Sequence, residues 1–179
     1  MKLLVLCLAV MFGMSLNAQV YKQTSSEVHF FSEAPLENIE ATNKDSKAIL
    51  RTKDSALVVV ITNLAFRFEK PLMEEHFNEN YMESETYPYS SFKGKVVSGM
   101  DFSKDGTYEV EVKGMFEVHG VKEEKSFKGS MTKSGNKISF SASFMMHVED
   151  YKIKVPTMYV KNIAEDVKVD LKFELKKSW

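Results

Sequence analysis

The chain has 179 residues and a formal net charge of −1, with 44% hydrophobic and 27% charged residues. This length suits one domain with a sizeable core and is too short to expect two. Because the charge is almost balanced, the chain has no general electrostatic attraction to nucleic acid or acidic lipid, so no nucleic-acid partner is expected. Its 13 Phe and 11 Met fit either an ordinary packed core or the lining of a cavity for a flexible apolar ligand.

The N-terminus has the layout of a secretory signal. A single Lys precedes an apolar run from Leu3 to Met14, and small and polar residues follow up to Ala18. The run is shorter than the roughly 20 residues that a transmembrane helix needs, and no later segment could span a bilayer, so no stable membrane insertion is expected. The sequence predicts cleavage after Ala18 and a periplasmic or secreted protein of residues 19–179. Cleavage would remove Cys7, the only cysteine, and with it any disulfide.

Most of the chain after this signal alternates apolar and polar residues, which is the pattern of a strand with one dry face. The clearest examples are residues 107–118, 137–148 and 166–177, and shorter ones lie at 90–97 and 126–133. In 107–118, for example, the alternation places Val110, Val112 and Phe116 on one face.

One strand segment and three turns complete this pattern. The segment 56–64 is apolar on both faces, which predicts that it is covered on both sides. Asp105-Gly106, Gly120 and Gly135-Asn136 are tight-turn signals between strands. Short strands joined by tight turns predict an all-β domain whose antiparallel sheet closes into a barrel or packs against a second sheet.

The stretch PLMEEHFNENYMESETYP, residues 71–88, interrupts the strands. Pro71 suits a first helical turn, good helix formers follow, and Met73, Phe77 and Tyr81 form one apolar stripe at intervals of four residues. The sequence predicts a short helix at about 71–81, inserted between two strands, which caps the barrel mouth with its stripe turned inward.

The charged residues of this stretch do not indicate an active site. Its carboxylates are predicted to form a solvated helix face rather than a catalytic acid pair: Glu74, Glu75, Glu79, Glu83 and Glu85. His76 and Glu79 could share a face, but with no second His or any Cys nearby, no metal site is predicted.

The other histidines and the candidate nucleophiles give no clearer sign of chemistry. His119 is predicted to hydrogen-bond the local backbone of its turn, and His147 to point outward. The chain has no Gly-x-Ser-x-Gly motif and no cysteine after Ala18, which argues against nucleophilic catalysis. No catalytic residue and no cofactor are predicted.

Four segments in chain order resemble the YceI-like family of exported proteins. They are VHFFSEAPLENIEATN (28–43), FRFEKPLMEEHFNENYMESETYPYSSFKGKV (66–96), FEVHGVKEEKSF (116–127) and DYKIKVPTMYVKNIAEDVKVDLKFEL (150–175). The sequences of the first two segments are typical of Bacteroidetes-type members of this family. The resemblance implies a lipocalin-like, eight-stranded antiparallel β-barrel whose apolar channel holds a polyisoprenoid or another long-chain lipid, and it allows a homodimer. One departure is the segment 117–123, which lacks the hydroxyl residues that the family often has around its His-Gly pair.

The inward faces supply the candidate ligand-binding residues. These are Phe66, Phe68, Met73, His76, Phe77, Tyr81, Phe92, Val110, Phe116, Phe127, Met131, Phe140, Phe144 and Met146, and Val112 and Leu171 share the same faces. Lys70, His76, Asn78 and Asn80 are candidate contacts for a lipid head group. An eight-stranded barrel of this size holds either side chains or one slender ligand, so each lining residue could equally be packed core.

Three functions are therefore compared. The favoured one is an exported protein that sequesters or carries a long apolar lipid, by resemblance a polyisoprenoid. The alternative is a ligand-free periplasmic stress or protein-interaction module with a side-chain-filled barrel. A lipid-modifying hydrolase ranks below both, because it needs a carboxylate or Ser within hydrogen-bond reach of His76 or His119 inside the cavity.

Overall fold

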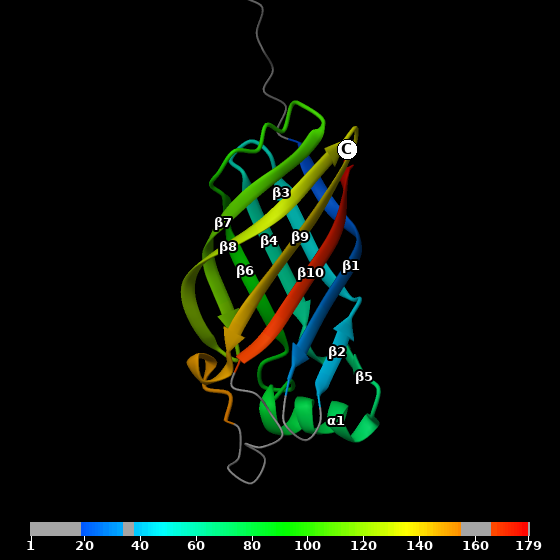
Figure 1. Ribbon diagram of the computed structural model, residues 1–179, viewed down its shortest axis with the longest axis vertical. Coiled ribbons are helices and arrows are strands. Elements are labelled where there is room, and N and C mark those ends of the chain that lie inside the picture. Colours follow the sequence, from blue (N-terminus) through cyan, green and yellow to red (C-terminus); the bar gives the residue numbers. More distant parts are fainter. Residues whose placement is uncertain (1–18, 34–37, 155–165, 179) are drawn as a thin grey trace, which may run out of the picture.

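The computed structural model describes residues 19–33, 38–154 and 166–178, which form one closed antiparallel barrel (Figure 1). The predicted signal peptide lies outside the described residues. The strands are β1 (Val20–Ser32), β2 (Ile39–Asn43), β3 (Ser46–Arg51), β4 (Ala56–Thr62), β5 (Phe66–Phe68), β6 (Tyr89–Val96), β7 (Gly106–Val118), β8 (Val121–Ser134), β9 (Lys137–His147) and β10 (Asp166–Ser178). Hydrogen bonds between β1 and β10 close the barrel.

Ten strand segments occupy eight positions around the barrel, because two strands are interrupted. β2 and β3 both pair with β1, while β5 continues β4 by pairing with β2. The predicted eight-stranded, lipocalin-like barrel is confirmed.

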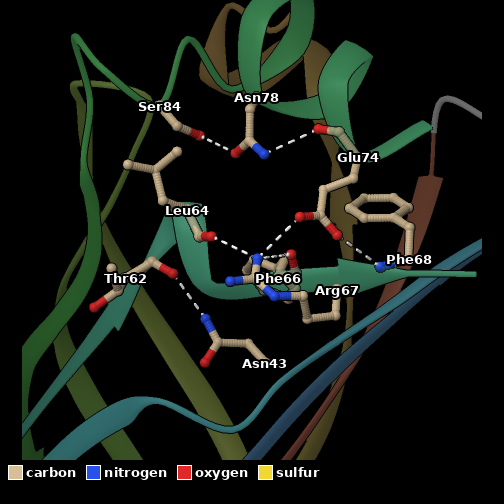
Figure 2. A network of polar contacts seen from close by, with 9 residues as sticks. All are labelled: Asn43, Thr62, Leu64, Phe66, Arg67, Phe68, Glu74, Asn78 and Ser84. Atoms are coloured by element: carbon tan, nitrogen blue, oxygen red, sulfur yellow. Dashed lines mark hydrogen bonds and ion pairs between the residues drawn. The ribbon is translucent and has the colours of Figure 1, made fainter. Parts of the chain in front are cut away.

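Buried side-chain amides stabilise these interruptions. Asn43 is fully buried at the end of β2, and its Nδ2 donates to the carbonyl oxygen of Thr62 at 2.7 Å (Figure 2). Its Oδ1 accepts from the backbone N–H of Asp45 at 2.8 Å and from the hydroxyl of Ser46 at 3.1 Å. The amide thus pairs with backbone groups of Thr62 and Asp45 at the point where the bend interrupts the ladder.

The predicted helix at 71–81 is confirmed and lies across one end of the barrel (Figure 1). It begins as α1 (Pro71–His76) and continues as η2 (Phe77–Tyr81), a π-helical turn. Asn78 Nδ2 donates to Glu74 O at 2.9 Å, which is the carbonyl that an α-helix would pair with the backbone N–H of Asn78. This local competition favours the wider turn, in which Met82 N donates to Phe77 O at 2.8 Å.

The predicted alternation holds in β7 and β9, while the prediction for 56–64 is wrong. In β4, Leu57, Val59 and Ile61 are buried on the inner face, as the period of two requires. Val58 and Val60 lie on the outer face and are only half-buried. A barrel is a single layer that buries its inner face alone, and scattered apolar residues outside it are tolerated.

The end of the barrel opposite α1 is solid. Its packed side chains are each at most 2% exposed: Tyr21, Leu50, Met131, Ile138, Phe173 and Leu175. The loop 97–105 runs over this end (Figure 1), and its Met100 and Phe102 pack against the core.

An ion pair joins the same loop to the barrel. Lys133 is 8% exposed, and its Nζ donates to Asp105 Oδ1 at 2.6 Å. This hydrogen bond raises the pKa of the Lys133 ammonium and lowers the pKa of the Asp105 carboxyl. The bond therefore holds the loop over the solid end.

Candidate lipid-binding cavity

The half of the barrel next to α1 contains a cavity of about 510 Å³. Its walls come mainly from aromatic and aliphatic side chains of the strands, together with the inner side of the helix. Three of the lining residues are exposed: Lys70 and Leu72 at the start of α1, and His76 at its end. The cavity therefore opens to solvent beside α1.

Twelve of the fourteen predicted binding residues line this cavity. They are Phe66, Phe68, Met73, His76, Phe77, Tyr81, Phe92, Phe116, Phe127, Phe140, Phe144 and Met146, and Val112 and Leu171 line it as well. Val110 and Met131 do not line it, and both are buried. A period of two identifies the inner face of a strand but not the depth at which the cavity ends.

The candidate head-group contacts likewise divide into residues that line the cavity and residues that do not. Lys70 and His76 line the cavity at its opening, whereas Asn78 and Asn80 do not line it. The side chain of Asn78 is already used within the helix: its Nδ2 donates to Glu74 O, and its Oδ1 accepts from the Ser84 hydroxyl at 2.8 Å (Figure 2).

Several residues of the cavity wall are not among those predicted from the sequence. Among them are Val28 and Phe30 of β1 and Leu57, Val59 and Ile61 of β4. In β4, apolar residues on both faces concealed which face points inward. In β1, polar residues interrupt the pattern, and the register shifts at a bulge between Gln23 and Ser25.

Four phenylalanines join the helix to the barrel rim. The ring of Phe77 stacks on Phe30 at a centroid distance of 5.5 Å and contacts Phe66 at 5.4 Å and Phe68 at 5.1 Å. Such aromatic pairs add roughly 0.5–1.5 kcal/mol each beyond their buried area. The predicted stripe thus seats the helix over the cavity.

A second aromatic group forms the facing wall. Phe127 contacts Phe92, Phe116 and Phe144 at centroid distances of 5.8, 5.3 and 4.4 Å. Phe116 also meets Tyr151 edge to face at 5.6 Å. The empty space therefore has aromatic rings from β6, β7, β8 and β9 on this side.

The few polar groups in the wall are satisfied by the protein itself. Asn63 is fully buried; its Nδ2 donates to Tyr87 O at 2.6 Å, and its Oδ1 accepts from the Ser90 hydroxyl at 2.9 Å. Within the described residues, no buried side-chain nitrogen or oxygen lacks a hydrogen-bond partner. Because the polar groups of the wall already have partners, a ligand needs no polar group to pair with them, and the cavity suits a hydrocarbon chain.

A polar network ties α1 to β5 (Figure 2). Arg67 donates to the carbonyl oxygen of Leu64 at 2.9 Å and to Glu74 Oε1 at 3.0 Å, and Glu74 Oε2 accepts from Phe68 N at 3.3 Å. Glu74 is therefore a tether between helix and strand. The prediction that all five carboxylates form a solvated helix face is wrong for Glu74, whose side chain is only 29% exposed and is held by Arg67 and Phe68. Glu83 is exposed as predicted, but it lies beyond the helix.

Glu83 meets the histidine of the β7–β8 turn. His119 Nε2 lies 2.8 Å from Glu83 Oε2, and Nδ1 lies 3.1 Å from the carbonyl oxygen of Tyr151. The imidazole is 8% exposed and packs 4.4 Å from the ring of Tyr87. The predicted backbone hydrogen bond exists, but its acceptor lies 32 residues away rather than in the turn.

The turn geometry explains how His119 reaches these partners. His119 and Gly120 have φ angles of +48° and +74°, which is the two-residue hairpin turn with positive φ at both positions. A Cβ on Gly120 would come within 2.6 Å of the Tyr87 ring, so a glycine is required by both backbone and packing. The turn thus carries His119 against the segment that follows the helix.

The remaining observations concern metal and membrane. His147 points outward as predicted, and its Nδ1 pairs with Asp166 Oδ1 at 3.0 Å. Within residues 19–33, 38–154 and 166–178, no three His, Cys, Asp or Glu side chains come together as metal ligands. In the same part of the chain, no helix has the length and apolar character needed to cross a bilayer.

The sequence that forms this barrel matches the profile of a known family. The profile of the YceI-like domain covers residues 20–175. The chain belongs to the YceI-like family. Among curated proteins, none matches this sequence significantly.

Several solved structures share the fold at low sequence identity. A polyisoprenoid-binding domain from Saccharophagus degradans, implicated in plant cell wall breakdown, superposes with a TM-score of 0.76 at 16% identity, covering 88% of this chain and 98% of that domain. BcnA of Burkholderia cenocepacia gives 0.70 at 12% identity, covering 83% and 95%. The YceI protein of Campylobacter jejuni gives 0.63 at 16% identity, covering 82% and 89%.

Proposed function

We propose that this protein is exported and holds a long apolar lipid, specifically an isoprenoid chain, in the cavity between β-barrel and helix, in order to sequester or carry it. The observation that carries the proposal is the apolar cavity of about 510 Å³ with its internally satisfied polar groups. The polyisoprenoid-binding relative from Saccharophagus degradans supports the choice of ligand class.

The chemistry of the wall favours a lipid over a polar metabolite. Burying apolar surface contributes about 25 cal/mol per Å² to binding, and a chain with few polar atoms gains this free energy along its whole length. A polar metabolite would need donors and acceptors, and those in the wall, such as Asn63 and Ser90, are already paired with each other. Lys70 and His76 at the opening are placed to meet a polar head group.

The two alternative functions have less support. A ligand-free interaction module requires an interior filled with side chains, whereas only the end opposite α1 is filled. A hydrolase requires a histidine paired inside the cavity. His119 does have a carboxylate partner, but it does not line the cavity, and both ring nitrogens face acceptors of the protein itself.

The test is native mass spectrometry, combined with organic extraction, on protein exported from a bacterial host. We expect a stoichiometric long-chain lipid and a mature chain that begins at Gln19. A ligand-free mass that stays unchanged after incubation with isoprenoid quinones and prenyl phosphates would support the interaction module instead. Retention of residues 1–18 would argue against export through cleavage at Ala18.

A further inference from the structure

The outer wall of the barrel carries an apolar area over β3 and β4 that no other part of the described chain covers. Its centre consists of Ile49, Val58 and Val60, and Ile49 and Val58 are cross-strand partners. Ile49 is 45% exposed and the two valines are half-buried. Apolar side chains in this position are open to solvent and available to a partner.

Cations surround this centre on the same outer face. The strand register places Lys22 beside Ile49, Lys47 beside Val60, and Lys93 beside Val58. The next row across the strands adds three more exposed cations: Arg51, Lys95 and Lys113. The apolar centre and these six cations are hereafter called the docking face.

The docking face keeps an excess of positive charge. Arg51 is held by Asp54, to which its Nε and Nη2 donate at 2.8 and 2.6 Å. Lys47 and Lys113 each meet one carboxylate, at 3.0 and 3.4 Å. Within the described residues, three cations pair with no carboxylate: Lys22, Lys93 and Lys95. The net charge of −1 for the whole chain therefore conceals a basic face on one side of the barrel.

We infer that the docking face binds the surface of an anionic lipid bilayer. The apolar centre lies against the boundary between head groups and hydrocarbon, while the lysine stems extend along it and their ammonium groups meet the head-group phosphates. This contact is peripheral and needs no spanning segment. It is independent of what the cavity holds, so it stands apart from the proposed lipid binding inside the barrel.

A bilayer fits this face better than a protein does. A second copy related by a two-fold axis would place the same cations against one another, which is repulsive. An acidic protein is recognised best by arginine, whose planar fork pairs with carboxylates, and Arg51 is already used in this way by Asp54. Lysines without fixed partners suit the diffuse negative charge of a head-group layer.

Two exposed apolar residues extend the docking face toward the end of the barrel that carries α1. Tyr89, which is 57% exposed, is the cross-strand partner of Thr62 at the end of β4. Leu64, which is 47% exposed, follows in η1 (Asn63–Ala65). Tyrosine favours the boundary between water and hydrocarbon. Docking through this face therefore also holds the open end of the barrel near the bilayer.

The experiment measures co-sedimentation of the protein with vesicles of stated composition. One set consists of phosphatidylcholine alone, and the other of equal parts of phosphatidylcholine and phosphatidylglycerol. We expect the protein to partition at least about tenfold more into the anionic vesicles at low ionic strength, and this preference to fall as salt is added.

Two pairs of variants test the face against the opposite wall. Lys93→Gln combined with Lys95→Gln should lower partition into anionic vesicles at least about tenfold. Lys168→Gln combined with Lys172→Gln removes the same charge from the outer face of β10, which stands opposite β6 in the barrel order, and should have little effect.

The apolar centre is tested in the same way. Ile49→Ser should lower partition about threefold, since part of its side chain is buried in the bilayer interface. Met145→Ser is the control, because Met145 is 61% exposed on the outer face of β9, opposite β4. All four substituted lysines and both apolar residues are exposed, and circular dichroism verifies that each variant is folded.

Three results would overturn the inference. The first is equal partition into both kinds of vesicle, or binding to neither. The second is an equal loss in the β6 and β10 variants, which would reflect overall charge. The third is a dimer in analytical ultracentrifugation that Ile49→Ser dissociates, because it would assign the docking face to a second copy of the chain.

Discussion

His119 Nε2 lies 2.8 Å from Glu83 Oε2, and this contact joins the β7–β8 turn to the segment that follows the helix. Nδ1 of the same ring faces the carbonyl oxygen of Tyr151 in η3 (Val148–Tyr151), which follows β9. Carboxylate and carbonyl oxygens both accept hydrogen bonds, so each ring nitrogen of His119 faces an acceptor. One side chain thereby holds three connections at the open end of the barrel.

The first prediction concerns this contact. His119→Ala should lower the free energy of unfolding by roughly 1–3 kcal/mol, because it removes a buried imidazole and leaves the Tyr151 carbonyl oxygen without this partner. Hydrogen exchange should rise in residues 77–87 and 148–153. A double-mutant cycle with Glu83→Gln should show a non-additive coupling, and full additivity would mean that the two groups do not act together.

The second prediction concerns the aromatic seat of the helix. Phe77→Asp should reduce lipid occupancy below about a tenth of wild type, because a carboxylate among Phe30, Phe66 and Phe68 is costly to desolvate. The barrel should stay folded by circular dichroism, since Phe77 is not part of its solid end. Asn80→Asp adds the same charge to an exposed position of the helix and serves as control. Retention of lipid at the wild-type level would remove Phe77 from the binding residues.

The third prediction concerns the tether between helix and strand. Glu74→Gln should weaken the contact to Arg67, and because Arg67 is 67% exposed the loss should be below about 1 kcal/mol. Lipid transfer to acceptor vesicles should accelerate by about two- to fivefold as the helix opens more often. Glu75→Gln makes the same charge change one residue along and should transfer at the wild-type rate. Equal acceleration in both variants would point to overall charge instead of the tether.

The fourth prediction concerns acid stability. The pKa of Asp105 in the folded protein lies below its ordinary value of about 3.9, chiefly because Lys133 donates to it. As the pH falls, the unfolded chain therefore binds the proton first. The contribution of this pair is complete above that ordinary value and is lost as the pH falls through the lowered one.

Urea unfolding at neutral pH and near pH 3 measures this effect. Asp105→Asn should be less stable than wild type at neutral pH and should lose less stability on acidification. Glu174→Gln, on the outer face of β10, controls for the removal of one negative charge. An unchanged acid-induced loss in Asp105→Asn would show that the pair does not contribute to the linkage.

The sequence by itself determined the helix and the inner faces of β7, β9 and β10. Alternation with period two in β7, β9 and β10 is a local property, since neighbouring side chains must point to opposite faces of a strand. The stripe of Met73, Phe77 and Tyr81 is local in the same sense, and Pro71 fixes where the helix begins. For this reason most of the predicted binding residues do line the cavity.

Only the tertiary structure decided where the cavity ends and which charged side chains pair with distant residues. Val110 and Met131 have the same pattern as Val112 and Phe127, yet the first two are packed core and the last two are wall. Depth in a barrel depends on the stagger between strands that are distant in sequence. Glu83 likewise meets His119 across 36 residues, a contact made by closing the barrel and by no local pattern.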